Sequence, residues 1–403
     1  MAIKRLWQTY LNSYRGLSKE TWILALVMLI NRSGAMVIPF LGVYMTSQLG
    51  FDLKQAGLAL SCFGIGSIVG SFVGGWMTDK VGHYQTQVLS LFFSVPVFFL
   101  FPLFKSFFTL CLVIIALSFI TELLRPANSA SVSYYAKAEN LTKAFSLNRM
   151  AINLGWSIGP AMGGILAGYS YNFLFFVNGT MVLLAGIVFA LYFKGKEGKD
   201  VLENINDSPF VHTLQSKTAY QDRKFIFFVL LLILYATVFY QFLNSLPLFY
   251  KDVYLLSEIN IGYLLGFSGL MVFSLEMIIV DQAEKHLSIK QNMIIGTLLC
   301  AISFLCLMLP IGIAILYIAM FFLSVSEILV LPFSSTICVT RSSSLNRGSY
   351  MALHSLAFSA AHVLSPLYST QVAENYGFNM LWVITGFIMI VTAYGFHKVM
   401  QRM

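Results

Sequence analysis

The chain has 403 residues, of which 58% are hydrophobic and only 10% are Asp, Glu, Lys or Arg. Because a soluble domain carries roughly 25% charged residues, this composition excludes an ordinary soluble protein and predicts a chain that crosses the lipid bilayer many times. The formal net charge of +8 would suit nucleic acid, but the placement of the basic residues explains it without a nucleic-acid partner.

The first 20 residues are polar and basic, and the apolar run after them is too long for a signal peptide, so it is interpreted as a retained span. Twelve apolar runs follow one another, with approximate limits 20–48, 53–78, 85–104, 107–136, 142–169, 171–193, 225–250, 257–282, 289–309, 311–338, 346–371 and 377–399. Each is long enough to cross a membrane as a helix. The sequence therefore predicts an all-α membrane protein with twelve transmembrane helices.

The longest polar stretch lies between the sixth and seventh runs and divides the chain into two sets of six. We expect an N-terminal unit at 1–193, a cytoplasmic linker at 194–224 and a C-terminal unit at 225–403. The five cysteines lie in or near apolar runs and form no CxxC pair, so neither disulfides nor a metal site is expected.

Lysine and arginine are distributed unevenly between the two sets of connections. Of the 25 in the chain, Lys54, Lys105 and Lys251 lie on one side, Arg32 and Arg125 lie within spans, and the other 20 lie on the opposite side. Positively charged connections stay in the cytoplasm. Both termini and the central linker are therefore predicted to be cytoplasmic.

The two sets of spans also repeat each other at a fixed spacing. Glu122 in the fourth span has its counterpart in Glu327, 205 residues later, within the tenth span. Asp79-Lys80 and Pro160 recur at the same spacing, within one residue, as Glu284-Lys285 and Pro366. Such parallel repeats are related by an axis along the membrane normal, with the substrate between them.

Two glycine-rich motifs suggest a family. The second span ends in GGWMTDKVGH, which contains Gly75, Asp79 and Gly82, and the fifth reads NLGWSIGPAMGG, which contains Gly155, Gly159, Pro160, Gly163 and Gly164. These motifs resemble the loop signature and the G-x-x-x-G-P-x-x-G-G signature of the major facilitator superfamily. The second signature, together with RGSYMAL from Arg347, is similar to the drug–proton antiporter branch, although His83, Tyr84 and Gln85 replace the basic residues that usually follow the first.

The resemblance implies two six-helix bundles that rock about a central cavity and draw on an ion gradient. It also implies a monomer in the bacterial cytoplasmic membrane. We expect the eight motif residues to serve helix packing and gating rather than ligand binding, because small residues allow helices to approach closely.

Charged residues inside membrane spans are costly and mark candidate functional positions. Glu122 and Arg125 are three residues apart in ITELLRP, which places them on one helical face within reach of each other. One interpretation is a proton-responsive carboxylate held by an arginine; the other is a permanent ion pair that fixes the fourth span.

Arg32 lies roughly 18 Å along the helix from Glu20, which is far for a side chain that must reach the inner interface. We interpret it as a cavity cation that binds an anionic group of the substrate or holds Glu122 or Glu327, with Asn31 beside it. The alternative is an arginine that extends toward the membrane surface.

Three further groups are candidates for proton coupling. Glu327 has no arginine three residues later, and burial favours the neutral form of such an acid. Glu276 lies deep in the eighth span, and His354 belongs to a residue type that titrates near physiological pH. For each, the alternative is a group that is hydrogen-bonded or packed for structural reasons; the same holds for His362, a weaker candidate.

The seventh span contains FYQFLNSLPLFY. Its Tyr240, Gln241 and Asn244 are candidates for substrate binding, because aromatic rings interleaved with a few polar groups suit a pocket for amphipathic molecules. The alternative is aromatic packing at the membrane interface.

The function predicted from these features is secondary active transport rather than enzyme catalysis. We expect a proton-coupled antiporter that exports small amphipathic or hydrophobic compounds, with no cofactor besides the proton gradient; the sequence lacks the Gly-Lys-Ser/Thr motif of ATP-driven pumps. The alternatives are a proton-coupled symporter that takes up a peptide, sugar or organic anion, and a receptor that does not transport.

Overall fold

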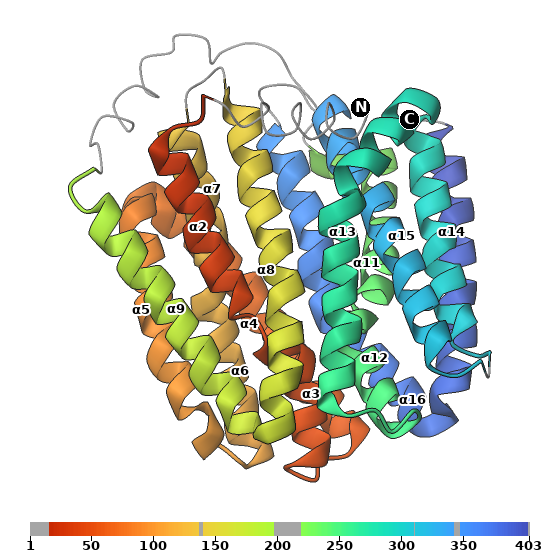
Figure 1. Ribbon diagram of the computed structural model, residues 1–403. Helices are drawn as coiled ribbons and strands as arrows, with labels where there is room; N and C mark the ends of the chain where they lie inside the picture. Colours follow the sequence, from red (N-terminus) through yellow and green to blue (C-terminus); the bar gives the residue numbers. More distant parts are fainter. Residues whose placement is uncertain (1–15, 137–139, 197–218, 310, 342–346, 402–403) are drawn as a thin grey trace, which may run out of the picture.

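The computed structural model describes residues 16–136, 140–196, 219–309, 311–341 and 347–401. All regular elements within these residues are helices (Figure 1). They are α2 (Lys19–Ser33), α3 (Val37–Ser47), α4 (Leu53–Lys80), α5 (His83–Leu100), η1 (Phe101–Leu103), α6 (Phe107–Glu122), α7 (Leu124–Tyr135), α8 (Leu141–Tyr169), α9 (Tyr171–Phe193), η3 (Ala219–Gln221), α11 (Arg223–Phe239), α12 (Gln241–Asp252), α13 (Glu258–His286), α14 (Ile289–Cys306), α15 (Ile313–Arg341) and α16 (Arg347–Met400).

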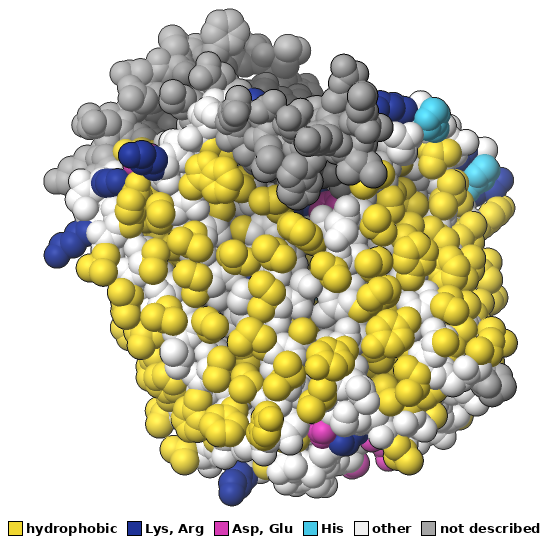
Figure 2. Space-filling view, in the orientation of Figure 1, with side chains coloured by type: hydrophobic (Ala, Val, Ile, Leu, Met, Phe, Trp, Pro, Cys, Tyr) yellow, Lys and Arg dark blue, Asp and Glu magenta, His cyan; other side chains and the backbone are white. Residues whose placement is uncertain are grey.

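Eleven segments of the described chain are long and apolar enough to cross a membrane. The last of them, Leu353–Met400, contains Gly377 with the non-helical angles φ 79° and ψ 165°, so α16 consists of two helices joined at this glycine. Counting both gives the twelve passages that the sequence predicts. Figure 2 shows hydrophobic side chains covering the middle of the molecule, with Lys and Arg gathered toward its two ends.

Three membrane passages consist of two shorter helices. The first passage is interrupted at Gly34, between α2 and α3, and the seventh at Tyr240, between α11 and α12. The fourth is interrupted at Leu123, between α6 and α7. Pro126 explains this third break, because a proline has no N–H to donate to the carbonyl four residues earlier, that of Glu122.

The N-terminal half (α2–α9) and the C-terminal half (α11–α16) lie side by side in Figure 1, drawn red to yellow-green and green to blue. Two pairs of helices form most of the seam between them: α8 packs along α13, and α4 packs along α16. The predicted linker falls mostly outside the described residues, so its limits stay a prediction.

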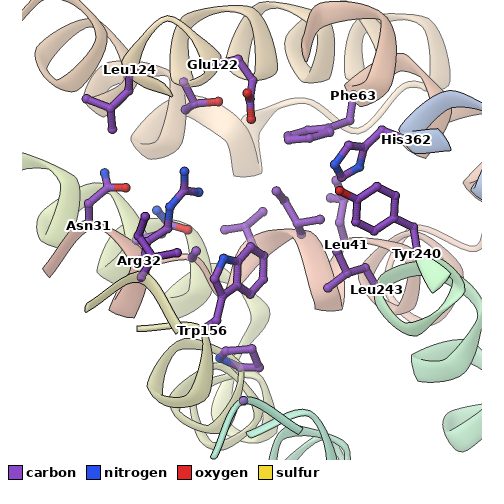
Figure 3. A pocket seen from close by; sticks show the side chains of 18 of the residues that line it. Asn31, Arg32, Leu41, Phe63, Glu122, Leu124, Trp156, Tyr240, Leu243 and His362 are labelled. Carbon is purple, nitrogen blue, oxygen red and sulfur yellow. The ribbon is translucent and has the colours of Figure 1, made fainter. Parts of the chain in front are cut away.

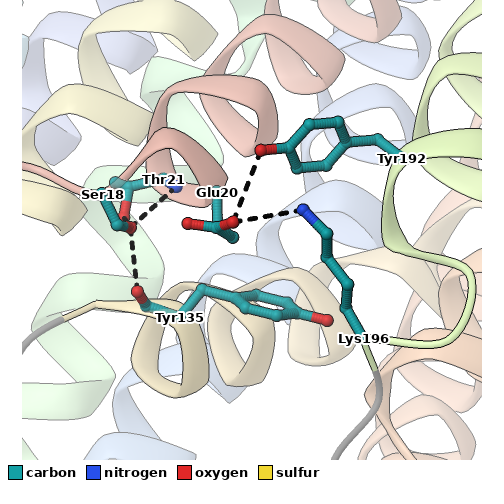
Figure 4. Close-up of polar contacts among 6 residues, drawn as sticks. All are labelled: Ser18, Glu20, Thr21, Tyr135, Tyr192 and Lys196. Atoms are coloured by element: carbon teal, nitrogen blue, oxygen red, sulfur yellow. Dashed lines mark hydrogen bonds and ion pairs between the residues drawn. The ribbon is translucent and has the colours of Figure 1, made fainter.

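The beginning of α2 is fixed by polar contacts to two other helices (Figure 4). Ser18 accepts a hydrogen bond from the Thr21 N–H and donates one, 2.9 Å long, to the carbonyl oxygen of Tyr135 at the end of α7. Lys196, just after α9, forms an ion pair with Glu20 at 3.2 Å. These contacts fix the first turn of α2, the helix whose last turn carries Arg32.

Candidate functional site

A central cavity of about 290 Å³ lies between the two halves and is lined by residues of both. Its wall is largely apolar and aromatic, with Phe63, Trp156 and Leu243 among the residues in Figure 3. The polar residues in the wall are Asn31, Arg32, Ser90, Ser94, Thr121, Glu122, Asn153, Asn178, Tyr240, Ser268, Glu327 and His362. The cavity therefore combines a large apolar surface with one cation and two carboxylates.

Arg32 reaches this cavity because the first passage breaks directly after it. It occupies the last turn of α2, where the unpaired carbonyl groups of a helix favour a positive charge. Its guanidinium points into the cavity toward the wall that carries Glu122 (Figure 3). Within the described residues it has no hydrogen-bonding or ion-pair partner, and its Nε atom is buried and unpaired.

The expected pairing of Glu122 with Arg125 is not found among the ion pairs of the described residues. Glu122 lines the cavity and accepts a hydrogen bond of 3.3 Å from Ser71 of α4, whereas the Arg125 side chain is exposed. Leu123 between them has the helical angles φ −58° and ψ −30°, so the helical spacing is kept and the two side chains still do not pair. Arg125 lies close enough to act electrostatically on His362.

Glu327 lines the cavity from the opposite half, on α15. It is partly buried and makes no hydrogen bond or ion pair within the part of the chain that the structure describes. Of the carboxylates predicted to couple protons, it is therefore the one without a polar partner. Its repeat counterpart Glu122 faces the same cavity from the N-terminal half.

Glu276, for which the sequence leaves proton coupling and structural hydrogen bonding open, does not line the cavity. It lies in the seam between α8 and α13, where it forms an ion pair with Arg149 and accepts a 2.8 Å hydrogen bond from Asn153. Arg149 was missed as a partner because the sequence places it near the cytoplasmic end of its span, where a lysine or arginine indicates topology. Asn153 also reaches the cavity wall.

His354 is likewise absent from the cavity wall. It is buried, its Nε2 atom forms a 2.9 Å hydrogen bond with Ser334, and its ring packs against Phe358. These contacts match the structural alternative rather than a transport role.

His362, the weaker candidate in the sequence, does line the cavity. Its ring stacks on Tyr240 with a centroid separation of 4.0 Å, and it meets Phe63 of the other half edge-on at 5.7 Å.

Gln241 and Asn244, two of the predicted substrate-binding residues, do not line the cavity. Gln241 is fully buried and donates to Thr385, and Asn244 donates to the carbonyl oxygen of Tyr240 and to Ser365. The cavity face of this passage carries Tyr240 and Leu243. Both amides point to the opposite side of the helix, which packs against α16.

The glycines of the fifth passage serve two interfaces. A methyl group on Gly155 would lie 2.5 Å from Cβ of Arg32, and one on Gly163 would lie 2.7 Å from Cβ of Met36. Gly159 faces the carbonyl oxygen of Arg32 at 3.0 Å. These three glycines therefore allow α8 to approach the broken first passage, while Pro160 lines the cavity.

Gly164 faces the other half instead. A methyl group there would lie 2.4 Å from the carbonyl oxygen of Glu258 and 2.7 Å from Cα of Gly262 in α13. In the shorter motif, a methyl group on Gly75 would meet no atom within 4 Å, and Gly82 has the left-handed φ of 106° that glycine adopts readily. The side chain of Asp79 lies outside what the structure describes.

The two ends of the seam differ. At the end away from the termini, the halves are joined by a 3.2 Å hydrogen bond from the Leu53 N–H to Glu374 and by one of 2.9 Å from Tyr171 to Glu258. Toward the termini, α4 packs against helices of its own half. Gly70 and Gly74 contact the end of α6 and the start of α7, and a methyl group on Gly75 would meet no atom within 4 Å. Nearer the termini, the ion pair of Arg149 with Glu276 still joins α8 to α13 across the seam.

Comparisons with known proteins agree with this architecture. The sequence profile described as Major Facilitator Superfamily matches residues 21–342. The Na(+), Li(+), K(+)/H(+) antiporter of Planococcus maritimus is 23% identical over 396 residues, covering 91% of this chain and 92% of its own. The quinolone resistance protein NorA of Staphylococcus aureus is 25% identical over 173 residues, 43% of this chain and 44% of its own. The crystal structure of a peptide transporter POT in complex with sulfate superposes with a TM-score of 0.77 at 17% identity, covering 94% of this chain and 95% of its own.

Proposed function

Since the chain belongs to the Major Facilitator Superfamily and is a transporter, we propose that it is a proton-coupled antiporter that exports small amphipathic compounds. The observation that carries the proposal is the central cavity, where carboxylates of both halves, Glu122 and Glu327, face one largely apolar space. An amphipathic molecule finds apolar surface and a few polar anchors there.

The charges of the cavity wall favour exchange. Arg32 contributes one positive charge, and Glu122 and Glu327 contribute one negative charge each when ionised. The wall then carries one net negative charge in a poorly solvated space, where an uncompensated charge is costly. One proton or one cationic group of a substrate neutralises it, and the two compete for the same carboxylates. Mutually exclusive binding is what antiport requires.

The seam supports alternating access. The halves are joined by hydrogen bonds at the end that carries Leu53 and Glu258, and by the Arg149–Glu276 ion pair nearer the termini. The lysine and arginine distribution indicates that the termini are cytoplasmic. Rocking of the halves about the seam would expose Glu122 and Glu327 to the two sides of the membrane in turn.

The similarities to known proteins agree with the proposal at different levels. The Planococcus relative is named as an antiporter that exchanges cations for protons, and the Staphylococcus relative as a resistance protein. Exchange and export are therefore both represented among sequence relatives. We place the protein in the bacterial cytoplasmic membrane as a monomer.

The test is the direction of proton movement in proteoliposomes that enclose a pH-sensitive dye. With a proton gradient imposed, addition of a transported amphipathic compound should move protons opposite to the compound, and an uncoupler should abolish the response. Proton movement in the same direction as the compound would refute antiport. Protein-free liposomes serve as the control for passive diffusion.

A second candidate function is uptake of an organic anion together with protons. The observation in its favour is the unpartnered guanidinium of Arg32, which offers a site for an anion. An anion bound there would leave Glu122 and Glu327 to carry protons in the same direction. The sign of proton movement in the same experiment separates this symport from antiport.

A further inference from the structure

We propose that the cavity recognises zwitterionic aromatic amphiphiles, with the anionic group of the substrate on Arg32 and its cationic group on Glu327. This inference rests on the proposed function and specifies its substrate class. It follows from three observations, which concern the anion end, the cation end and the aromatic residues of the cavity wall.

The anion end is the break in the first passage. The guanidinium of Arg32 faces the cavity without a partner among the described residues, and its buried Nε is unpaired. The second half of this passage, α3, begins at Val37 with no side-chain cap, and Val37 and Ile38 both line the cavity. An uncapped amino end of a helix attracts anions. The carbonyl end of α2 lies at the same break, so the guanidinium of Arg32 is the feature that places positive charge at this point of the wall.

The cation end is Glu327, on the opposite half. The other two carboxylates that the sequence predicts to couple protons have partners: Glu122 accepts a hydrogen bond from Ser71, and Glu276 pairs with Arg149. Glu327 has none within the described residues. It can therefore bind a proton or the ammonium group of a substrate, one at a time, which links this site to proton exchange.

Aromatic side chains line the same cavity as Arg32 and Glu327. Trp156 points into the cavity from the same wall as Arg32, and Tyr240 and His362 form a stacked pair on the other (Figure 3). Aromatic side chains pack favourably against a planar ring in stacked or edge-on geometry. A planar ring system that carries an anionic and a cationic group finds a partner for each of its parts among these lining residues.

A substrate with a single charged group can pair with only one of the two residues, Arg32 or Glu327. A cation without an anionic group leaves Arg32 unpaired once the cavity closes over it, and an anion without a cationic group leaves Glu327 available only to a proton. A buried group without its partner loses free energy. A zwitterion satisfies both ends, so it is expected to bind most tightly.

The experiment uses four compounds with one fluorescent body: ciprofloxacin, which carries a carboxylate and a basic amine, its methyl ester, its N-acetyl derivative, and the compound with both changes. Dissociation constants are measured by fluorescence with the purified full-length protein. We expect the ester to bind about tenfold or more weakly than ciprofloxacin, as for the loss of one hydrogen bond to a charged group. In Arg32→Gln this ratio should fall to about one, and in Glu327→Gln the corresponding ratio for the N-acetyl derivative should fall likewise.

Arg223→Gln and Glu284→Gln are matched controls, because both side chains are exposed and neither lines the cavity. They should keep both ratios. The inference is overturned if the wild-type protein binds the ester as tightly as ciprofloxacin, if Arg32→Gln keeps the preference for the free carboxylate, or if none of the compounds binds. If the ester is exchanged for protons although the ratio is one, antiport stands and this inference fails. If the ratios are as expected but no protons move, the substrate class stands and antiport fails.

Discussion

The two halves share a scaffold but differ in the charges that they present to the cavity. Each half begins with a passage that breaks at an equivalent place, Gly34 and Tyr240, 206 residues apart. The N-terminal half offers an unpartnered Arg32 at this break, whereas the C-terminal half offers Tyr240 stacked on His362. The breaks belong to the repeated fold, and the side chains at the breaks distinguish the halves.

The carboxylates show the same divergence. Glu122 and Glu327 occupy equivalent positions, but Ser71, which donates to Glu122, is replaced 205 residues later by Glu276. Glu276 pairs with Arg149 across the seam and leaves Glu327 without a partner. We propose that this difference gives anion recognition mainly to the N-terminal half and proton release mainly to Glu327 of the C-terminal half.

The largest expected effect is the loss of proton exchange in Glu327→Gln. Glutamine keeps the shape of the side chain but cannot release a proton, and no other cavity carboxylate in the described residues lacks a polar partner. We expect at least about a hundredfold slower substrate-induced proton movement, equivalent to about 2.7 kcal/mol, and about tenfold slower movement in Glu122→Gln. The dye-loaded proteoliposomes measure both. Equal effects of the two substitutions would contradict the assignment of the proton to one half.

The next effect concerns the seam itself. In Gly164→Ala the added methyl group would meet backbone atoms of Glu258 and Gly262 at 2.4 and 2.7 Å. The helices α8 and α13 must therefore move apart near Glu258. Such overpacking costs about 1–3 kcal/mol and should reduce both the thermal midpoint and the transport rate. Gly75→Ala is the control from the other motif, because its methyl group meets no atom within 4 Å. If both variants behave alike, the seam does not depend on the glycine contact.

Breaking the ion pair in the seam should destabilise the protein by a similar amount, and a second substitution should recover part of the lost stability. Arg149→Gln leaves the carboxylate of Glu276, whose side chain is 16% exposed, with Asn153 alone, and should destabilise the protein by about 1–3 kcal/mol. The double variant Arg149→Gln, Glu276→Gln removes the unpaired charge and should recover part of that loss. Thermal unfolding of the three variants in detergent measures it. Additive losses would show that the two groups do not interact.

The sequence predicts the passages, the repeat and the charged residues that reach the cavity, because each depends on local composition or on a fixed spacing. Arg32, Glu122 and Glu327 belong to this group. The partners of these residues were not predictable in the same way. The Arg149–Glu276 pair joins segments more than 120 residues apart, and no periodicity within either passage indicates it.

Competing contacts and helix ends explain the other differences. Residue spacing brings Glu122 and Arg125 within reach, but Glu122 accepts a hydrogen bond from Ser71 and Arg125 is exposed, which spacing alone does not indicate. At Tyr240 a new helix begins, and Gln241 and Asn244 turn toward α16. Proline after Glu122 is a readable signal for the break at Leu123, whereas no residue in the seventh passage marks the break at Tyr240.

The smallest expected effect concerns Asp222, a charged residue outside the membrane at the start of the C-terminal half. Asp222 caps α11 and accepts hydrogen bonds from Arg341 and Tyr350. Burial raises the pKa of Asp222, but hydrogen bonds from Arg341, the Phe225 N–H and Tyr350 outweigh it and lower the pKa from 3.8 to about 2. A carboxylate with a lowered pKa stabilises the folded state above its unfolded value, and this stabilisation is lost as the pH falls from about 4 to about 2.

Asp222→Asn should therefore destabilise the protein at neutral pH by on the order of 1–2 kcal/mol. It should also make the thermal midpoint fall less steeply as the pH is lowered, which is the acid limb of the stability profile. Thermal midpoints of the purified protein between pH 7 and pH 3 measure this. Asp281→Asn is the matched control, because its ion pair with Lys285 is more than half exposed and such pairs contribute about 0–1 kcal/mol. An unchanged acid limb in Asp222→Asn would mean that another carboxylate dominates acid unfolding. The N-terminal half has Ser18 in the equivalent place, capping α2 and bonded to Tyr135, and a serine cap does not titrate in this pH range.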